Sequence, residues 1–260
     1  LVSHQGRAIT SRSHESVLKD VRKLLDTPDF KGTITDIGGP AGNIYGSYAK
    51  DIGLCAKCRR SSCMVPRPCP NYVADGESLM KLLRKVRSVQ GVKHLYVNSG
   101  IRLDLAVKQP ELMRELIRYH VSGHMKVAPE HLHPRVLELM RKNPAEDFYK
   151  FMEFFEEESR KAGKEQYLIP LFISNFPGCT EREMQTVDDF LNRRNWSPQQ
   201  VQDYIPLPMT MGAAMYYTGK TPSGEPITVN RGLAERRPQI QVLKKKRTRP
   251  FHQKRNNHRN

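Results

Sequence analysis

Apolar residues with helical spacing alternate with short apolar runs along most of the chain. The helical spacing predicts helices over 16–27, 77–89, 110–120, 134–142, 144–163 and 181–194. The short runs predict strands over 32–37, 92–98, 124–128, 166–173 and 200–205. The run "QYLIPLFI" is apolar at almost every position, which is typical of a strand buried on both faces. Helix and strand therefore alternate five times.

Each predicted helix has one apolar face that would pack on a sheet. These faces comprise Val17, Leu18, Val21, Leu24 and Leu25; Leu79, Leu82, Leu83 and Val86; Leu112, Leu116 and Tyr119; and Phe148, Phe151, Met152 and Phe155. Ser13 is placed to cap the first helix, and Pro110 occupies a first-turn position in the third. The faces indicate one substantial core.

This alternation predicts an α/β fold of parallel strands joined by right-handed crossovers, either a barrel or an open sheet. The pattern begins with a helix, so we expect that a first strand has been lost. It fails after about residue 215, where Pro, Gly and charge dominate. We therefore divide the chain into residues 1–215, with a Cys-rich insert at 51–72, and a C-terminal segment over 216–260.

Positive charge is concentrated at the C-terminal end. The chain carries a net charge of +16, and residues 231–260 supply +10 of it from eleven Lys and Arg and one Glu. The end "KKKRTRPFHQKRNNHRN" is polar and lacks periodicity, so we expect a disordered basic tail. Such a tail can bind nucleic acid through phosphate contacts, although a tail of this kind is more often a solvated chain end.

The composition predicts a cytoplasmic protein without membrane spans. No stretch of about 18 apolar residues occurs, and the first residues have no apolar signal core. In the reducing cytoplasm, clustered cysteines seldom form structural disulfides.

Four of the five cysteines lie within one short stretch, "CAKCRRSSCMVPRPC". Cys55, Cys58, Cys63 and Cys69 have the spacing C-x2-C-x4-C-x5-C, which suits thiolate ligation of one zinc ion or one iron–sulfur cluster. The spacing does not distinguish between these metals. Cys179 stands apart and is interpreted as a packing residue.

Polar residues and glycines follow each predicted strand. In parallel α/β folds the chemistry lies at the carboxyl ends of the strands, so these residues predict a ligand-binding mouth. The candidates are Asp36, Gly38, Gly39 and Asn43; Asn98, Ser99, Gly100, Arg102 and Asp104; Lys126, Pro129, Glu130 and His131; Ser174, Asn175, Pro177 and Gly178; and Pro206, Pro208 and Thr210. Charged pairs such as Arg102 and Asp104 are costly to bury unless they are partnered, which favours a functional role over a purely structural one.

Other common sites are poorly supported. The spacing of His120, His124, His131 and His133 does not fit the helical H-E-x-x-H zinc motif. The stretch "GGPAGNIYG" lacks the G-K-[ST] ending of a phosphate-binding loop.

Several segments, in order, resemble the YgiQ-type family of radical S-adenosylmethionine proteins. They are "HQGRAITSRSHESVL", "DIGGPAGNIYG", "CRRSSCMVPRPCPN", "GVKHLYVNSGIRLDLA", "YHVSGHMKVAPEH", "AGKEQYLIPLFISNFPGC" and "QVQDYIPLPMTMGAAMYYTGK". The resemblance implies a partial (β/α)6 barrel that binds a [4Fe–4S] cluster and S-adenosylmethionine. It further implies formation of a 5′-deoxyadenosyl radical, which abstracts hydrogen from an unknown substrate, and an electron donor such as a reductase.

By the same resemblance, Gly38, Gly39 and Pro40 correspond to the motif that holds the methionine amino group. From their places at strand ends, Ser99, Arg102, Lys126 and Glu130 are expected to contact the cofactor or the substrate. The four clustered cysteines would form an auxiliary site, either zinc or a second iron–sulfur cluster.

The chain departs from the family pattern at its start. The family's cluster-binding C-x3-C-x2-C would lie just before the segment that begins "LVSHQGR", so we expect that motif upstream and this chain alone to be inactive. One alternative is a zinc-containing nucleic-acid-binding protein that uses the basic tail. A degenerate barrel that serves as a scaffold without cofactor is a third interpretation.

Overall fold

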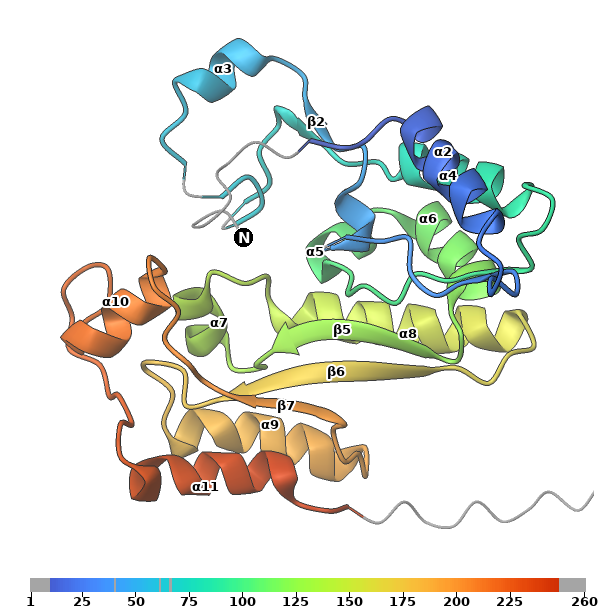
Figure 1. The fold of residues 1–260 in the computed structure, drawn as a ribbon. Coiled ribbons are helices and arrows are strands. Elements are labelled where there is room, and N and C mark those ends of the chain that lie inside the picture. The colour runs from blue at the N-terminus through green and yellow to red at the C-terminus, as the bar shows by residue number, and fades with distance from the viewer. Residues whose placement is uncertain (1–9, 40, 61, 66, 248–260) are drawn as a thin grey trace, which may run out of the picture.

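The chain folds into an α/β structure in which helices cover one side of parallel strands (Figure 1). The computed structural model describes residues 10–39, 41–60, 62–65 and 67–247. Pro40, one of the predicted cofactor-binding residues, and the basic tail beyond residue 247 lie outside the described residues.

Helices and strands follow the order that the hydrophobic pattern predicts, with several short additions. The α-helices are α2 (His14–Leu25), α3 (Ile52–Ala56), α4 (Glu77–Arg87), α5 (Leu103–Ala106), α6 (Pro110–Glu115), α7 (Pro134–Met140), α8 (Ala145–Lys161), α9 (Glu181–Arg193), α10 (Met211–Thr218) and α11 (Leu233–Lys244). The strands are β1 (Thr33–Ile34), β2 (Tyr48–Ala49), β3 (Tyr72–Val73), β4 (His94–Leu95), β5 (His124–Glu130), β6 (Tyr167–Ser174) and β7 (Gln200–Asp203). A 3-10 turn, η1, spans Gly42–Ile44, and a π-helical turn, η2, spans Leu116–His120.

All five predicted strands form and run parallel. Strand β1 pairs with β4, and β5, β6 and β7 form a three-stranded sheet in that order. A parallel bridge between Ile101 and Val127 joins the segment after β4 to β5. The strands therefore follow one another in sequence order, and within the described residues they do not close into a barrel.

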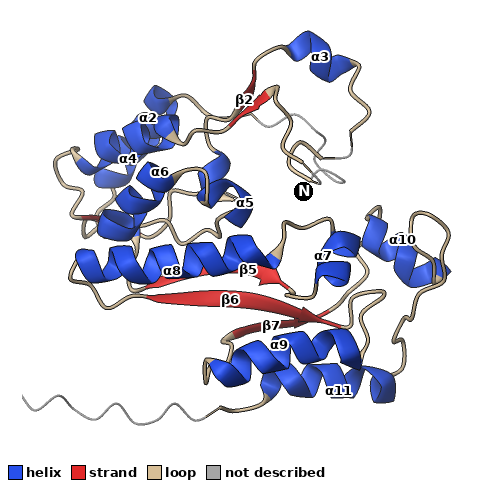
Figure 2. Ribbon diagram, turned by 180° about the vertical axis from the view of Figure 1, so that it is seen from behind, coloured by secondary structure: helices blue, strands red, loops and turns tan. Residues whose placement is uncertain are grey.

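The core lies between the strands and the helices α4, α6, α8 and α9. Phe148, Phe151 and Phe155 of α8 are fully buried, and Phe172 of β6 packs near Phe190 of α9 with ring centroids 6.4 Å apart. Figure 2 shows α8 and α9 from the side on which they cover the sheet. Burying a side chain of this size contributes about 1.5–3 kcal/mol, so the aromatic residues of α8 hold the helix in place.

The capping and packing predicted for the N-terminal helices are confirmed. The Ser13 hydroxyl accepts a hydrogen bond from Ser16 N, which caps α2, and Val21 is buried. In α4 all four predicted apolar residues are buried. The apolar face of α2 is less complete than expected, because Leu24 is exposed at the end of the helix.

The predicted helix over 110–120 changes character after Glu115. Residues 116–120 adopt the π-helical turn η2, which rotates the following side chains out of register with α6. Tyr119 therefore does not join the buried face as predicted: it is 50% exposed, and the Arg87 guanidinium lies 4.0 Å from its ring centroid.

The C-terminal segment contains two helices that the pattern did not predict. Helix α11 packs against α9, β6 and β7, with Gln239 and Leu243 as its buried residues. The basic stretch after it is held as far as Arg247, whose guanidinium pairs with Asp188 of α9 and is 4% exposed. The expectation of a disordered tail was therefore wrong for residues 244–247, because α11 extends to Lys244 and Asp188 supplies a counter-charge to Arg247.

No helix in the described part of the chain is both long enough and apolar enough to cross a membrane.

Candidate functional site

The residues after β1 and β4 meet at one carboxylate, that of Asp36. Asp36 Oδ2 accepts a hydrogen bond of 2.6 Å from the Ser99 hydroxyl, and Oδ1 accepts from Gly38 N at 2.9 Å and Asn98 N at 3.2 Å. Partial burial would raise the pKa of Asp36, but the hydrogen bonds from Ser99, Gly38 and Asn98 outweigh it and lower the pKa. The mouth therefore contains an ionised carboxylate.

The two glycines of the Gly-Gly pair have different environments. A Cβ on Gly38 would lie 2.5 Å from Ser99 Oγ, so only glycine allows the two loops to approach this closely. Among the described residues, no atom lies within 4 Å of a Cβ built on Gly39, and the same holds for Gly100 in the loop after β4. Gly38 thus has a structural role, whereas Gly39 and Gly100 leave their backbone open to a ligand.

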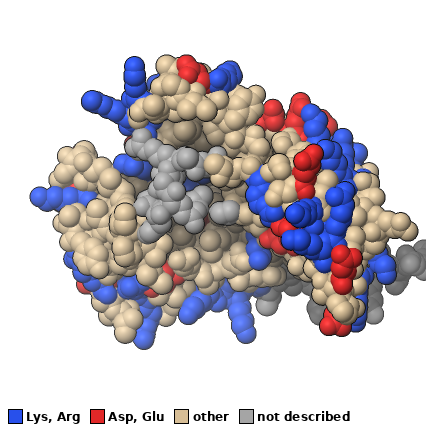
Figure 3. All heavy atoms as spheres, turned by 45° about the horizontal axis from the view of Figure 1, so that its top comes forward, with Lys and Arg blue, Asp and Glu red and all other residues tan. Residues whose placement is uncertain are grey.

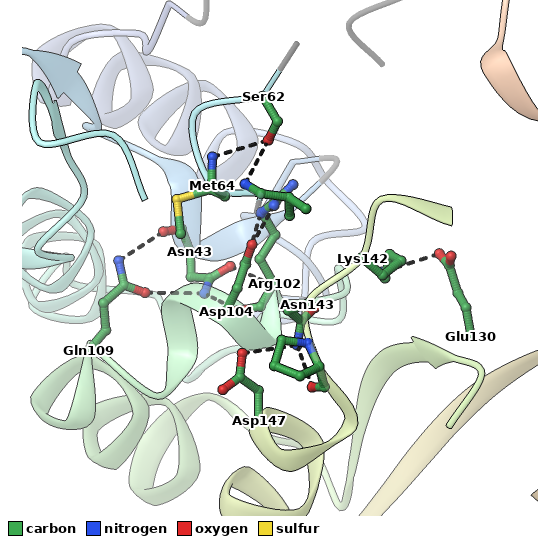
Figure 4. A network of polar contacts seen from close by, with 12 residues as sticks. Asn43, Ser62, Met64, Arg102, Asp104, Gln109, Glu130, Lys142, Asn143 and Asp147 are labelled. Carbon is green, nitrogen blue, oxygen red and sulfur yellow. Dashed lines mark hydrogen bonds and ion pairs between the residues drawn. The ribbon is translucent and has the colours of Figure 1, made fainter. Parts of the chain in front are cut away.

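A second group of polar side chains surrounds Arg102 and Asp104, beside α5 (Figure 4). The guanidinium of Arg102 makes two hydrogen bonds to the Asp104 carboxylate, at 2.6 Å and 3.1 Å. The Arg102 backbone is held by Asn43, whose amide accepts from Arg102 N at 2.8 Å and donates to Arg102 O at 2.9 Å. Asn43 is buried and also donates to Gln109 Oε1. The network fixes the Arg102 backbone while its side chain remains partly exposed.

The α7–α8 connection brings further charges to this group. Asn143 donates to Asp147 Oδ2 at 3.2 Å, and Lys142 pairs with Glu130 at 3.4 Å, as Figure 4 shows. Burial raises the pKa of Asp147, and the nearby charge of Asp104 adds to the effect despite the Asn143 hydrogen bond. Two carboxylates from different helices therefore lie within electrostatic range of each other.

Two residues at the ends of β5 and β6 have left-handed backbone conformations. Glu130 has a φ of 62° and Asn175 a φ of 58°. The Asn175 side chain donates to Asp203 Oδ1 at 2.7 Å, and its backbone N–H donates to Gln239 of α11 at 2.8 Å. Such conformations are uncommon outside glycine and occur often at functional sites.

Lys126 is placed differently from the other candidates. It is the third residue of β5 rather than a residue of its carboxyl end, it lies opposite Ile169 of β6, and its side chain is exposed. Its neighbours Met125 and Val127 are buried, so Lys126 points to the sheet face opposite the helices. Pro40 lies outside the described residues.

Beneath the mouth, Cys179 and His131 form a buried polar contact. His131 Nδ1 accepts from His133 N, so its Nε2 donates toward Cys179 Sγ at 3.5 Å, and the thiol donates to Gln239 Oε1 at 3.3 Å. Burial lowers the pKa of His131 to about 3 and raises the pKa of Cys179 to about 12. Both groups are neutral at pH 7, which confirms the interpretation of Cys179 as a packing residue.

The four clustered cysteines lie on a loop that projects from the strand ends, between β2 and β3 (Figure 1). Within the described residues no three side chains of His, Cys, Asp or Glu are already placed as a metal site.

Charge on the flank formed by α2 and α4 is mixed rather than uniformly basic. Figure 3 shows Lys and Arg interspersed with Asp and Glu over this part of the surface. Three ion pairs account for part of the mixture: Lys81 with Glu77, Arg12 with Asp20, and Arg84 with Glu115. This flank is therefore not a continuous surface for a polyanion.

Sequence reasoning found most of these residues but missed several of their partners. Gln109, Lys142 and Asp147 were not predicted, because each lies on a helix or helix connection far from its partner in sequence. Gln109 lies within the polar stretch "KQPE", so its burial had no signal in the sequence.

Comparison with known proteins identifies relatives over most of the chain. A UPF0313 protein of Geobacter sulfurreducens is 44% identical over 244 residues, which cover 94% of this chain and 40% of the relative. UPF0313 proteins of Methanocella arvoryzae and Rhodopseudomonas palustris are 42% and 41% identical, each over 91% of this chain and over 40% and 36% of the relative. The chain thus spans well under half the length of these relatives. No protein-family model matches it.

Proposed function

From its membership of the UPF0313 family, the family of YgiQ-type proteins, we propose that this chain forms part of the S-adenosylmethionine-binding barrel of a radical enzyme. The observation that carries the proposal is the junction of Asp36, Gly38 and Ser99, with the open backbone of Gly39 beside it. The substrate is unidentified, and an electron donor such as a reductase would be a partner.

The strand arrangement supports a partial (β/α)6 barrel. Five parallel strands follow in sequence order, and the bridge between Ile101 and Val127 links the two groups of strands. Sequence-ordered parallel strands with helices on one side are the building plan of α/β barrels. The open side of the sheet, which carries Lys126, would face the barrel interior.

The residues after β1 and β4 suit the methionine part of the cofactor. The ammonium group of the methionine part would be attracted by the ionised Asp36 carboxylate. Other atoms of the methionine part could approach the backbone of Gly39 and Gly100, because these glycines carry no side chain. Ser99 holds the carboxylate in place through its 2.6 Å hydrogen bond. When bound, S-adenosylmethionine supplies the 5′-deoxyadenosyl group, and this chain binds and orients it.

Three of the remaining candidates, in the segment after β4 and on β5, would contact the cofactor or the substrate. Arg102 presents a partly exposed guanidinium on a fixed backbone, which suits a carboxylate or phosphate group. Glu130 and Lys126 lie on β5, with Glu130 at its carboxyl end.

The ligands of the proposed [4Fe–4S] cluster are not assigned to residues of this chain. Among the described residues, no three cysteines have the C-x3-C-x2-C spacing after a strand. The four clustered cysteines follow β2, whereas the family's cluster motif is expected before α2. The proposal therefore requires a C-x3-C-x2-C motif, which these 260 residues do not contain.

The test uses the polypeptide at the full length of its relatives, reconstituted anaerobically with iron and sulfide. We expect oxygen-sensitive visible absorbance and dithionite-dependent release of 5′-deoxyadenosine. Gly39→Ala should weaken S-adenosylmethionine binding by about tenfold, equivalent to about 1.4 kcal/mol, because a methyl group would occupy the open approach. Gly232→Ala, which adds the same methyl at another uncrowded glycine, is the control.

A full-length protein that binds no iron would overturn the proposal. So would equal S-adenosylmethionine affinity of the Gly39→Ala and Gly232→Ala variants.

The alternative of nucleic-acid binding through the basic tail has no observation in its favour. Arg247 is engaged with Asp188, and the tail beyond it lies outside the described residues.

A further inference from the structure

Hydrogen bonds close the base of the loop that carries the four clustered cysteines. We call residues 50–71 the cysteine loop. Lys50 N donates to Asn71 O at 2.9 Å, Asp51 N donates to Asn71 Oδ1 at 2.8 Å, and Asn71 Nδ2 donates to Asp51 O at 2.7 Å. The two strands β2 and β3 continue this closure as an antiparallel pair. The loop is thus a separate unit with a fixed base.

Hydrogen bonds connect cysteines of the loop to one another and to its base. Cys58 N donates to Cys55 O at 3.1 Å, and Cys69 N donates to Cys63 O at 2.7 Å, so the cysteines are held as two pairs. Asn71 Nδ2 also donates to Cys55 Sγ at 3.3 Å, which brings the first pair to the base where the second pair ends. All four cysteines therefore belong to one small region of the loop.

N–H groups already point at two of these sulfurs. Asn71 Nδ2 donates to Cys55 Sγ at 3.3 Å, and Arg60 N donates to Cys58 Sγ at 3.4 Å. Hydrogen bonds of this kind stabilise the thiolate, which is the form that binds a metal.

The cysteine loop has little apolar packing of its own. Ile52 and Leu54 of α3 are 78% and 63% exposed, and Figures 1 and 2 both show α3 projecting away from the other helices. Segments of this size without a core usually depend on a cross-link or a metal.

We propose that Cys55, Cys58, Cys63 and Cys69 together bind one soft metal centre, a zinc ion or an iron–sulfur cluster, and that binding closes the cysteine loop. Ligation draws in the four thiolates and releases their protons to solvent. Arg60, which donates to Ser62 O and Arg67 O across the loop, lies where its charge offsets the anionic ligands. Four thiolates match both kinds of centre, which have the same ligand chemistry.

The closed loop would also support the mouth. Ser62 Oγ accepts from Met64 N at 3.1 Å, and Met64 is buried beside Asn43 and Arg102, as Figure 4 shows. The metal centre would therefore fix a segment that packs against the Arg102 network. This inference does not depend on S-adenosylmethionine binding.

The experiment measures metal content and protease sensitivity in the 260-residue chain, purified and stripped with chelator. One arm adds zinc alone, and the other adds ferrous iron and sulfide without oxygen; bound metal and acid-labile sulfide are then quantified. We expect one centre per chain in one of the arms. Trypsin cleavage at the exposed Lys57, Arg59 and Arg60 should then slow by about tenfold, because binding stabilises the folded loop.

Two variants make the result specific. Replacing all four loop cysteines with serine should abolish metal retention and leave trypsin cleavage fast, whereas Cys179→Ala should retain the metal. Stoichiometric metal in neither arm, or equal retention by the four-serine variant, would overturn the inference. Gly39→Ala should leave metal content unchanged, so failure of the S-adenosylmethionine proposal would be seen separately.

Discussion

Gln239 offers a sharp test of how the C-terminal helix is attached. Its side chain accepts hydrogen bonds from Asn175 N at 2.8 Å and the Cys179 thiol at 3.3 Å, and it donates to Cys179 O at 2.9 Å. The residue is 1% exposed, so water cannot replace these partners. Helix α11 is therefore attached to the loop after β6 through this amide, together with the 3.0 Å hydrogen bond from Asn175 Nδ2 to Arg236 O.

We expect Gln239→Ala to lower the free energy of unfolding by about 2–6 kcal/mol. The substitution leaves two buried backbone groups unpaired, Asn175 N–H and Cys179 C=O, and each such group costs about 1–3 kcal/mol. The thiol is a weak donor and adds little. Gln239→Met, which keeps the side-chain volume, should lose nearly as much, because hydrogen bonding rather than a cavity causes the loss.

Urea unfolding followed by far-ultraviolet circular dichroism measures the effect. Gln241→Ala is the matched control, since this residue lies on the same helix with its side chain exposed, and its change should stay within about 0.5 kcal/mol. If Gln239→Ala and Gln241→Ala unfold with equal free energies, the attachment of α11 does not depend on this amide.

Two further predictions concern the mouth and its base. Gly38→Ala should lower the free energy of unfolding by about 1–3 kcal/mol, because its Cβ would lie 2.5 Å from Ser99 Oγ. Thermal unfolding measures the effect, and Gly39→Ala is the control, because its Cβ would meet no described residue and should change stability less. The free energy of unfolding should also fall as the pH drops from 6.5 toward 3. In this range His131 is protonated in the unfolded chain but stays neutral in the folded chain, where burial lowers its pKa to about 3. The contribution of this one group is at most about 1.4 kcal/mol per pH unit, and it should disappear in His131→Gln; an unchanged pH profile would contradict the assignment.

The sequence predicted the parallel strands and their helices because apolar spacing directly reports burial. Helix α4 shows this well, since its four predicted residues are the ones that are buried. Helix α11 escaped prediction because one of its two buried residues is Gln239 and because it contains Pro238. A helix whose contact face is polar gives no apolar period to detect.

The candidate site was predictable where residues follow strands and unpredictable where partners come from elsewhere. Asp36, Ser99 and Arg102 were found by their places after β1 and β4. The pairing of Glu130 with Lys142 depends on how α7 connects to α8, which spacing does not encode. The left-handed conformation of Glu130 is also invisible in the sequence, because glutamate shows no preference for it.

The unequal lengths of the strand ladders have a mechanical consequence. Strands β1 and β4 share two residue pairs, whereas β5 and β6 are paired over most of their length and β6 pairs with β7 over four residues. Amide hydrogens on the β1 and β4 side should consequently exchange faster than those of β6. The segment that holds Ser99 is thus more easily displaced than the segment that holds Asn175. A molecule bound across both would move the first segment while the second stays in place.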